Sequence, residues 1–427
     1  MKNIKNNLCI KNRNLGILVL GQIISLFGSS IQRFALSLYV LDMTGSGSVF
    51  ASILAFSMIP IVLLAPIAGV IADRLDRKKV MVILDFISSA VIIGYAALLL
   101  GGYNHVMFVG ILMFLLSGIS TIYQPAVTSS IPDLAKEDEL LAANGIVQQV
   151  SSLSNFLGPI IAGVLYGLLG IQGVIWINGI SFFLSAILEL FLKIPRKVAP
   201  TNGKIVSVFL SDIKESGIYL KHENPVIFRM IFTSGLYNLF LVPVFSVGAP
   251  YIIKITLGMS NEVYGLAEGV IAMGMILGAM IVSMRPKAFH IKTIHQVLYW
   301  SCFSMLMMGV CLIAPKTEES VRWLMTACFT LFAMTIMLVL GIANVISAAF
   351  IQKEVPNHML GKISAYGLAF ATFCVPLGQL IFGGLLEVFS EHVAFLVMIS
   401  AVFTFGVTLI VRWNVKQIPE EVEDVIE

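Results

Sequence analysis

The chain has 427 residues, of which 58% are hydrophobic and only 12% are charged, whereas about a quarter of the residues in a typical soluble domain are charged. This composition excludes a soluble globular protein and indicates one that crosses a membrane many times. The net charge of +3 does not point to nucleic acid, because the basic residues of membrane proteins gather on cytoplasmic loops.

Apolar runs bounded by charged and turn residues predict twelve membrane-spanning helices, each near the roughly 20 residues that a bilayer requires. In the first half of the chain we expect helices at 15–40, 49–71, 80–100, 105–130, 140–169 and 173–193. In the second half we expect them at 226–253, 262–284, 293–314, 322–350, 361–388 and 392–413.

The polar stretch between the two halves predicts the domain organisation. We expect an N-terminal six-helix bundle at 1–193, a cytoplasmic linker at 194–225 with a short amphipathic helix, a C-terminal six-helix bundle at 226–413 and an acidic cytoplasmic tail at 414–427. The halves also repeat, because Gly158 corresponds to Gly378 and Gly163 to Gly383. Parallel six-helix repeats are a known transporter plan, with a substrate cavity between the halves. The predicted fold is therefore all-α, with twelve transmembrane helices in two pseudo-symmetric six-helix bundles.

The distribution of the 27 Lys and Arg residues predicts the orientation. With both termini in the cytoplasm, only Lys254, Lys316 and Arg322 fall on the opposite side, and Arg33 lies inside a predicted helix. Basic residues favour cytoplasmic loops, so we expect a multi-pass protein of the cell membrane with both termini in the cytoplasm.

Several classes of site have no motif in the sequence. The five cysteines show neither CxxC nor Cys/His spacing, so neither a disulfide framework nor a metal site is implied. No phosphate-binding GxxxxGKS or GxxxxGKT motif and no catalytic triad occur, which argues against an ATP-driven pump and against an enzyme. We expect no cofactor.

Two motifs resemble those of the major facilitator superfamily, and the resemblance covers essentially the whole chain. The segment 69–79, GVIADRLDRKK, is similar to that superfamily's signature between helices two and three, although Asp76 stands where the usual pattern has glycine. The segment 154–163, SNFLGPIIAG, is similar to the Gly-Pro motif of antiporter subfamilies. Segments 21–28 and 124–144 resemble the macrolide-efflux and enterobactin-exporter branch of the drug:proton antiporters. Many such antiporters carry an Arg in helix four, but 109–131 contains no Arg or Lys.

The loop signature contains the candidate gating residues. Asp73 lies at the end of the second predicted helix, where its carboxylate can pair with Arg77 or cap a neighbouring helix through its dipole. Arg74 belongs to the same cluster, and Asp85 is a candidate member of this network. The alternative interpretation is that the basic residues only anchor the loop at lipid phosphates.

Gly158 and Pro159 are candidate gating residues of a different kind. Proline removes a helix hydrogen bond and glycine allows close helix packing, so the fifth helix is expected to kink and pack tightly. Packing alone also explains either residue taken singly.

Glu268 and Arg33 are the candidates for proton coupling, because each lies inside a predicted span where an ionisable group is costly. Desolvation favours the neutral form of a carboxyl group, which would let Glu268 exchange protons. The fixed charge of Arg33 can bind an anionic substrate group or tune a carboxylate. Equally, Glu268 can be a satisfied structural group and Arg33 can extend to the interface.

Polar residues in the predicted spans are candidates for lining a substrate cavity with mostly apolar walls. They are Gln22, Ser25, Gln32, Tyr123, Gln124, Asn155, Tyr237, Asn238 and Gln379.

The resemblance and these residues together predict a monomeric secondary transporter that exports a hydrophobic or amphipathic small molecule, such as a macrolide-like drug, in exchange for protons. One alternative is a siderophore or metabolite exporter of the same fold, for which Arg33 would bind the cargo. Another is a transport-inactive sensor or a lipid scramblase.

Overall fold

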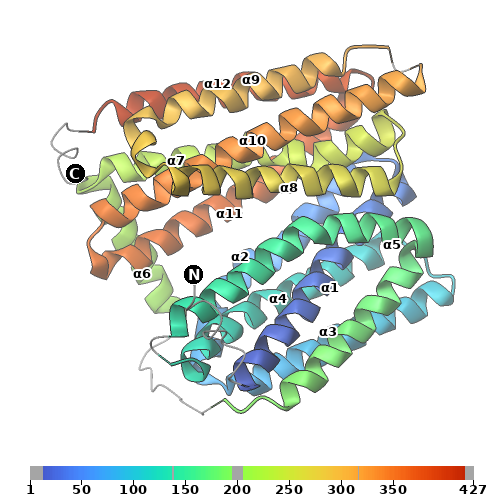
Figure 1. Cartoon of the computed structure of the whole chain (residues 1–427), viewed down its shortest axis with the longest axis vertical. Helices are drawn as coiled ribbons and strands as arrows, with labels where there is room; N and C mark the ends of the chain where they lie inside the picture. The colour runs from blue at the N-terminus through green and yellow to red at the C-terminus, as the bar shows by residue number, and fades with distance from the viewer. Residues whose placement is uncertain (1–12, 137–138, 195–204, 316, 419–427) are drawn as a thin grey trace, which may run out of the picture. The chain divides into compact units, whose positions relative to one another are not determined.

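The computed structural model describes residues 13–136, 139–194, 205–315 and 317–418, and within these ranges the regular structure is helical. The helices, labelled in Figure 1, are α1 Arg13–Thr44, α2 Gly47–Arg74, α3 Arg77–Leu100, α4 Val106–Leu134, α5 Leu140–Leu190, α6 Ile205–His222, α7 Pro225–Phe240, α8 Asn261–Met284, α9 Ile294–Cys311, α10 Glu319–Glu354, α11 Asn357–Val388 and α12 Val393–Val415. Eleven helices in the described ranges are long and apolar enough to cross a membrane. The prediction of an all-helical membrane protein is confirmed.

The contacts divide the chain into two compact units. Unit 1 comprises 1–44 and 56–208, and unit 2 comprises 45–55 and 209–427. The first turns of α2 therefore belong with unit 2 and the remainder of α2 with unit 1. The domain boundaries expected from the sequence, including the acidic tail, most of which lies outside the described residues, stay predictions.

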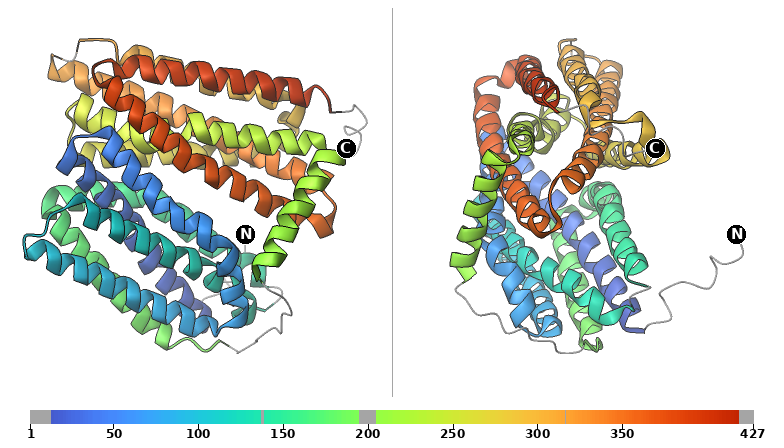
Figure 2. Two further views of the ribbon diagram at one scale, coloured as in Figure 1. Left: turned by 180° about the vertical axis from the view of Figure 1, so that it is seen from behind. Right: turned by 90° about the vertical axis from the view of Figure 1, so that its left-hand side faces the viewer.

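Unit 1 is built on helix α5, which packs against α1 and α3, while α4 packs against both of these helices (Figure 2). Apolar side chains from several helices fill the interior near the 74–77 turn, among them Leu15, Leu18, Met81 and Ile131. Packing these side chains together removes their apolar surface from contact with water or lipid.

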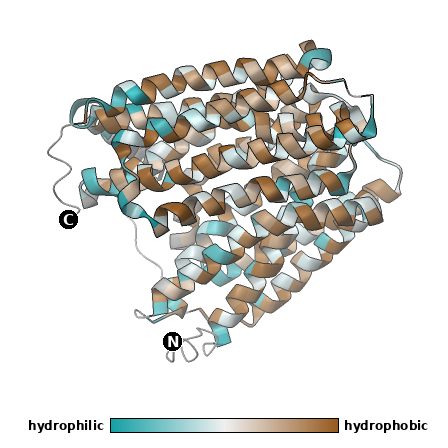
Figure 3. Ribbon diagram, turned by 45° about the horizontal axis from the view of Figure 1, so that its top comes forward, coloured by the Kyte–Doolittle hydropathy of each residue, from teal (hydrophilic) through white to brown (hydrophobic). Residues whose placement is uncertain are grey.

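In unit 2, α7 packs against α11 and α12, and α10 packs against α8 and α9. Glycines allow close approach between α8 and α10. A Cβ atom on Gly274 would lie 2.2 Å from the carbonyl oxygen of Met334, and one on Gly278 would lie 2.1 Å from that of Leu338. Small residues are the usual means of close helix packing in membranes. Figure 3 shows hydrophobic residues along the lengths of the helices and hydrophilic residues gathered at many of their ends.

Helix α5 contains the two helices expected at 140–169 and 173–193, joined through a single non-helical residue. Gly170 has φ 65° and ψ −177°, and there the chain turns back (Figure 1). A positive φ of this kind is readily available only to glycine. The expected connection of 170–172 is therefore reduced to one residue with non-helical angles.

The prediction of one regular α-helix over 226–253 is wrong. Helix α7 ends at Phe240, and two π-helical segments follow, Val244–Gly248 and Tyr251–Thr256. Pro243 and Pro250 directly precede these segments, and a proline has no N–H group with which to continue the α-helical pattern. The amide groups therefore bond five residues back, as from Ala249 to Val244.

Candidate functional site

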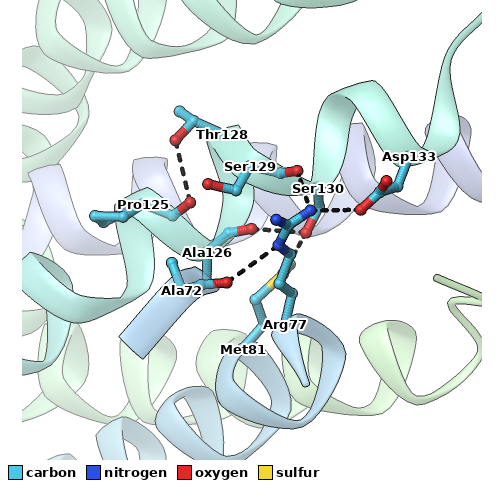
Figure 4. Close-up of polar contacts among 9 residues, drawn as sticks. All are labelled: Ala72, Arg77, Met81, Pro125, Ala126, Thr128, Ser129, Ser130 and Asp133. Atoms are coloured by element: carbon cyan, nitrogen blue, oxygen red, sulfur yellow. Dashed lines mark hydrogen bonds and ion pairs between the residues drawn. The ribbon is translucent and has the colours of Figure 1, made fainter. Parts of the chain in front are cut away.

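The turn between α2 and α3 holds Arg77 in a set of polar contacts with α4. Its Nη1 donates to the carbonyl oxygen of Ser129 at 2.6 Å and forms an ion pair with Asp133, and its Nε donates to the carbonyl oxygen of Ala72 at 3.1 Å (Figure 4). Only 17% of the Arg77 side chain and 5% of the Asp133 side chain are exposed. Arg77 thus ties the end of α4 to the turn.

The other charged residues of this turn have separate partners. The Asp76 carboxylate accepts a hydrogen bond from the amide of Lys79 and so caps the start of α3, which gives a local reason for an aspartate where the family pattern has glycine. Lys78 Nζ donates to the carbonyl oxygen of Leu190 at 2.6 Å. The side chains of Asp73 and Arg74 lie outside the described part of the structure, so their gating roles stay predictions.

Gly158 brings α5 against α1. A Cβ atom at Gly158 would lie 2.2 Å from Ser30 Oγ and 2.6 Å from Ser30 Cβ. Pro159 is buried, and the backbone angles around it remain helical. Gly378 of α11 is the equivalent position in unit 2. A Cβ atom added there would lie 2.3 Å from the carbonyl oxygen of Leu239 of α7. Both units therefore place a glycine at a close crossing between their first and fifth helices.

Arg33 and Glu268 belong to different units and have different surroundings. Arg33 is exposed, and its Nη2 donates to Asn155 Oδ1 at 3.5 Å. Glu268 is half-buried and accepts a hydrogen bond of 3.3 Å from the hydroxyl of Tyr264. These contacts leave the proposed proton coupling of either residue untested.

The cavity candidates of unit 2 make contacts between helices. The hydroxyl groups of Tyr237 and Thr408 lie 2.5 Å apart, and Asn238 Nδ2 donates to the carbonyl oxygen of Ala371 at 3.1 Å. Gln379 Nε2 donates to Ser246 Oγ, in the first π-helical segment, at 3.2 Å. These side chains hold α7 and the segment after it against α11 and α12.

The cavity candidates of unit 1 divide into an exposed and a buried group. Gln124 and Asn155 are exposed. Gln32 is buried, and neither polar atom of its side chain has a hydrogen-bond partner within the described residues. The structure brings the remaining three, Gln22, Ser25 and Tyr123, together in one buried network.

This buried network contains two carboxyl groups, Asp85 of α3 and Glu189 of α5, which are 2% and 0% exposed. Tyr123 of α4 donates to Glu189 Oε1 at 2.5 Å and accepts from Gln22 Nε2 at 2.9 Å. Ser25 of α1 donates to Asp85 Oδ2 at 3.1 Å.

Ser185 lies between the Asp85 contacts and Glu189. Its Oγ lies 2.8 Å from Ser25 Oγ, and it precedes Glu189 by four residues on the same helical face. Either hydroxyl can be the donor between the two serines, and Ser185 Oγ also lies 3.4 Å from the carbonyl oxygen of Gly21, to which it can donate. Four helical segments of unit 1 therefore meet around two carboxyl groups.

From the sequence we expected Asp85 as a gating residue, whereas Glu189, Ser185 and Asp133 were not expected. A signal for Glu189 was available, because it is an acidic residue in an apolar run with no basic residue before Lys193. Its partnership with Asp85 depends on how α3 and α5 pack, which the sequence does not reveal. No cluster of three or more His, Cys, Asp or Glu that could hold a metal occurs among the residues described.

Comparison with protein-family models assigns the chain to a family. The model described as Major Facilitator Superfamily matches residues 18–378. The chain belongs to this superfamily. The resemblance inferred from segments 69–79 and 154–163 is thereby confirmed.

Characterised relatives are similar at low identity over most of their length. Macrolide efflux protein A of Streptococcus pyogenes is 23% identical over 364 residues, which are 84% of this chain and 86% of the relative. The multidrug efflux pump Tap of Mycobacterium bovis is 22% identical over 418 residues, 94% of each chain.

Solved structures share the fold. A bacterial homologue of the iron transporter ferroportin, in an inward-facing state, has a TM-score of 0.72 at 18% identity and covers 95% of this chain and 99% of its own. The nucleoside transporter NupG has a TM-score of 0.70 at 14% identity, with 95% and 99% covered.

Proposed function

We propose that this protein is a secondary active efflux transporter of the cell membrane, with both termini in the cytoplasm, that works as a monomer. It exports a hydrophobic or amphipathic small molecule of the macrolide type by alternating access, and protons move inward in exchange. The observation that carries the proposal is the similarity, over most of the chain, to a macrolide efflux protein and a multidrug efflux pump within one transporter superfamily.

The glycine crossings support the alternating-access part of the proposal. Gly158 and Gly378 hold the first and fifth helices of each unit in close contact, so each unit is able to move as one packed body. In this proposal the Arg77–Asp133 ion pair is part of the cytoplasmic gate, with Asp73 and Arg74 beside it in the chain.

Inverted membrane vesicles with an acidic lumen test the proposal directly. Export from the cell corresponds to uptake into these vesicles, so erythromycin should accumulate in vesicles that contain the protein and should leak out when a protonophore collapses the gradient. Vesicles without the protein are the control. Uptake that follows an imposed sodium gradient but ignores the pH gradient would contradict proton exchange, and no uptake under either gradient would contradict macrolide export.

A second candidate cargo is an anionic metabolite or siderophore, because Arg33 is exposed on α1 and contacts the equally exposed Asn155. A guanidinium group is well suited to bind carboxylate or phosphate. Arg33→Gln should then abolish the transport of an anionic catecholate while erythromycin uptake persists. If erythromycin uptake alone is lost, this second candidate fails.

A further inference from the structure

Asp85 and Glu189 of unit 1 have different surroundings from Arg33 and Glu268, the two residues that the sequence suggests for proton coupling. Asp85 and Glu189 are enclosed by protein on all sides, whereas Arg33 is exposed and Glu268 is half-buried. A buried carboxylate is costly unless a cation or several donors compensate it. The partners of these two groups within the described chain are hydroxyl groups only.

Among the described side chains, no basic group on the surrounding helices contacts the pair. On α3, Lys78 donates to the carbonyl oxygen of Leu190, one residue beyond Glu189, and Arg77 is paired with Asp133 of α4. Neither lysine nor arginine side chains contact the two carboxyl groups anywhere in the described residues.

The other basic residues on these helices lie further along the helix axes, the nearest being the exposed Lys79 of α3, six residues or about 9 Å from Asp85. On α1, Arg33 is eight residues from Ser25 and Arg13 is further, which at 1.5 Å per residue places them about 12 Å or more along the axis. On the helix that carries Glu189, the next basic residue is Lys193, beyond its end. Two negative charges in this network would therefore repel each other without compensation.

Two polar atoms of the network are buried and have no hydrogen-bond partner, Oε2 of Glu189 and Oε1 of Gln22. A fully ionised network has a surplus of acceptors and too few donors. A proton bound to one carboxyl group removes the charge repulsion and adds one donor. The contacts of the two carboxyl groups are therefore better satisfied when one of them is protonated than when both are ionised.

We propose that Asp85 and Glu189 together form the site that carries the exchanged proton through the transport cycle. Tyr123 holds Glu189 and Ser25 holds Asp85 by hydrogen bonds, while Ser185 contacts Ser25 four residues before Glu189 on α5. One proton is taken up from water on one side of the membrane and released to water on the other. This inference rests on the proposed proton exchange and assigns it to unit 1 in place of Glu268.

A proton fits this site better than a metal cation does. The hydroxyl of Tyr123 is in direct contact with Glu189, and the two serine hydroxyls are in direct contact with each other. A bound cation would take these oxygens as its own ligands and separate them. The sodium arm of the experiment below tests this point.

Proteoliposomes with an imposed gradient and a clamped membrane potential provide the first test. One proton exchanged for each neutral erythromycin allows about a tenfold accumulation per pH unit, because one pH unit and a tenfold concentration ratio are equal free energies. We expect the wild type to approach this ratio. Glu189→Gln and Asp85→Asn should accumulate erythromycin no more than protein-free liposomes do, which trap this weak base passively, while Glu268→Gln should accumulate it like the wild type.

The outcomes separate the two proposals. If the wild type does not accumulate erythromycin with a pH gradient, the proposed function fails. If the wild type does so and both Glu189→Gln and Asp85→Asn still accumulate it, the site assignment fails although the function stands. If a sodium gradient drives accumulation in the wild type but not in Glu189→Gln, the site binds sodium and the proton assignment is wrong.

Infrared difference titration gives a readout that does not require transport. The carbonyl band of a protonated carboxylic acid should be lost or reduced in Glu189→Gln and should persist in Glu268→Gln. If Glu189→Gln does not fold, Glu189→Asp and Ser25→Ala serve instead and should shift the pH midpoint of this band. A band unaffected by every variant in the network would overturn the assignment.

Discussion

Gly158 of α5 faces Ser30 of α1 so closely that a methyl group at Gly158 would lie 2.2 Å from the serine hydroxyl and 2.6 Å from its Cβ. The Cβ of Ser30 cannot move aside by rotation of its side chain. Close contacts of this kind make an added methyl group destabilising in a well-packed interior.

The first prediction follows from this contact. Gly158→Ala should lower stability by about 2 kcal/mol, because the two helices must separate to admit the methyl group. Thermal unfolding in detergent measures the effect. Gly145→Ala, in the same helix and with no atom within 4 Å of the added carbon, is the matched control and should be neutral or stabilising. Ser30→Gly should restore most of the loss in the double variant. Equal stability of the two alanine variants would contradict the prediction.

The second prediction concerns the equivalent crossing in unit 2. The obstacle at Gly378 is the backbone oxygen of Leu239, 2.3 Å from the position of an added Cβ, so Gly378→Ala should cost about 3 kcal/mol, more than Gly158→Ala. Gly384→Ala on the same helix is the control, since that position has open space. Thermal unfolding again measures both. A Gly378→Ala protein that unfolds at the temperature of its control would show that α11 and α7 are not held this closely.

The third prediction concerns Arg77. Arg77→Ala removes three interactions and the cation that faces a nearly buried Asp133, so it should destabilise the protein by about 3 kcal/mol. Lys79→Ala removes the same charge from an exposed position in the same turn and should have little effect.

Arg77→Lys should be intermediate, because an ammonium group does not span acceptors from two helices as a guanidinium group does. Unfolding temperatures, measured at low and at moderate salt, give the comparison. If Lys79→Ala destabilises as much as Arg77→Ala, net charge and not the contact with α4 explains the effect.

The fourth prediction concerns Tyr237, which the sequence suggested as a cavity residue. Its hydroxyl lies 2.5 Å from that of Thr408, so Tyr237→Phe should cost about 1 kcal/mol of stability and leave the range of transported compounds unchanged. Uptake of a panel of macrolides and cationic dyes measures that range. The exposed Tyr103, changed to Phe, is the control. A changed range of transported compounds at unchanged stability would instead indicate that Tyr237 lines the substrate cavity.

The sequence predicted the helices well because the length of an apolar run and its charged ends are local properties. Segment 69–79 predicted both a membrane-surface turn and the family. The π-helical segments after Phe240 were not predicted, although Pro243 and Pro250 were visible, because the position at which a helix changes its hydrogen bonding depends on its neighbours. Local patterns therefore specified where helices lie but not how they deform.

The polar residues show the same limit more sharply. Ser25 and Tyr123 were selected because they are polar in apolar spans, and Glu189 was overlooked although it fits the same criterion. Their meeting with Asp85 requires four helical segments to pack in a particular rotation. Nothing in the spacing of residues along one chain specifies such a rotation.

The single-residue turn at Gly170 also bears on how the protein is made. The residues around it, from Leu168 to Gly173, include no charged side chain, and the two helical segments of α5 flank it directly. A ribosome-bound chain therefore has no hydrophilic loop to move across the bilayer at this point. The two segments are able to enter the membrane together as one helical hairpin, already carrying Gly158 on one arm and Glu189 on the other.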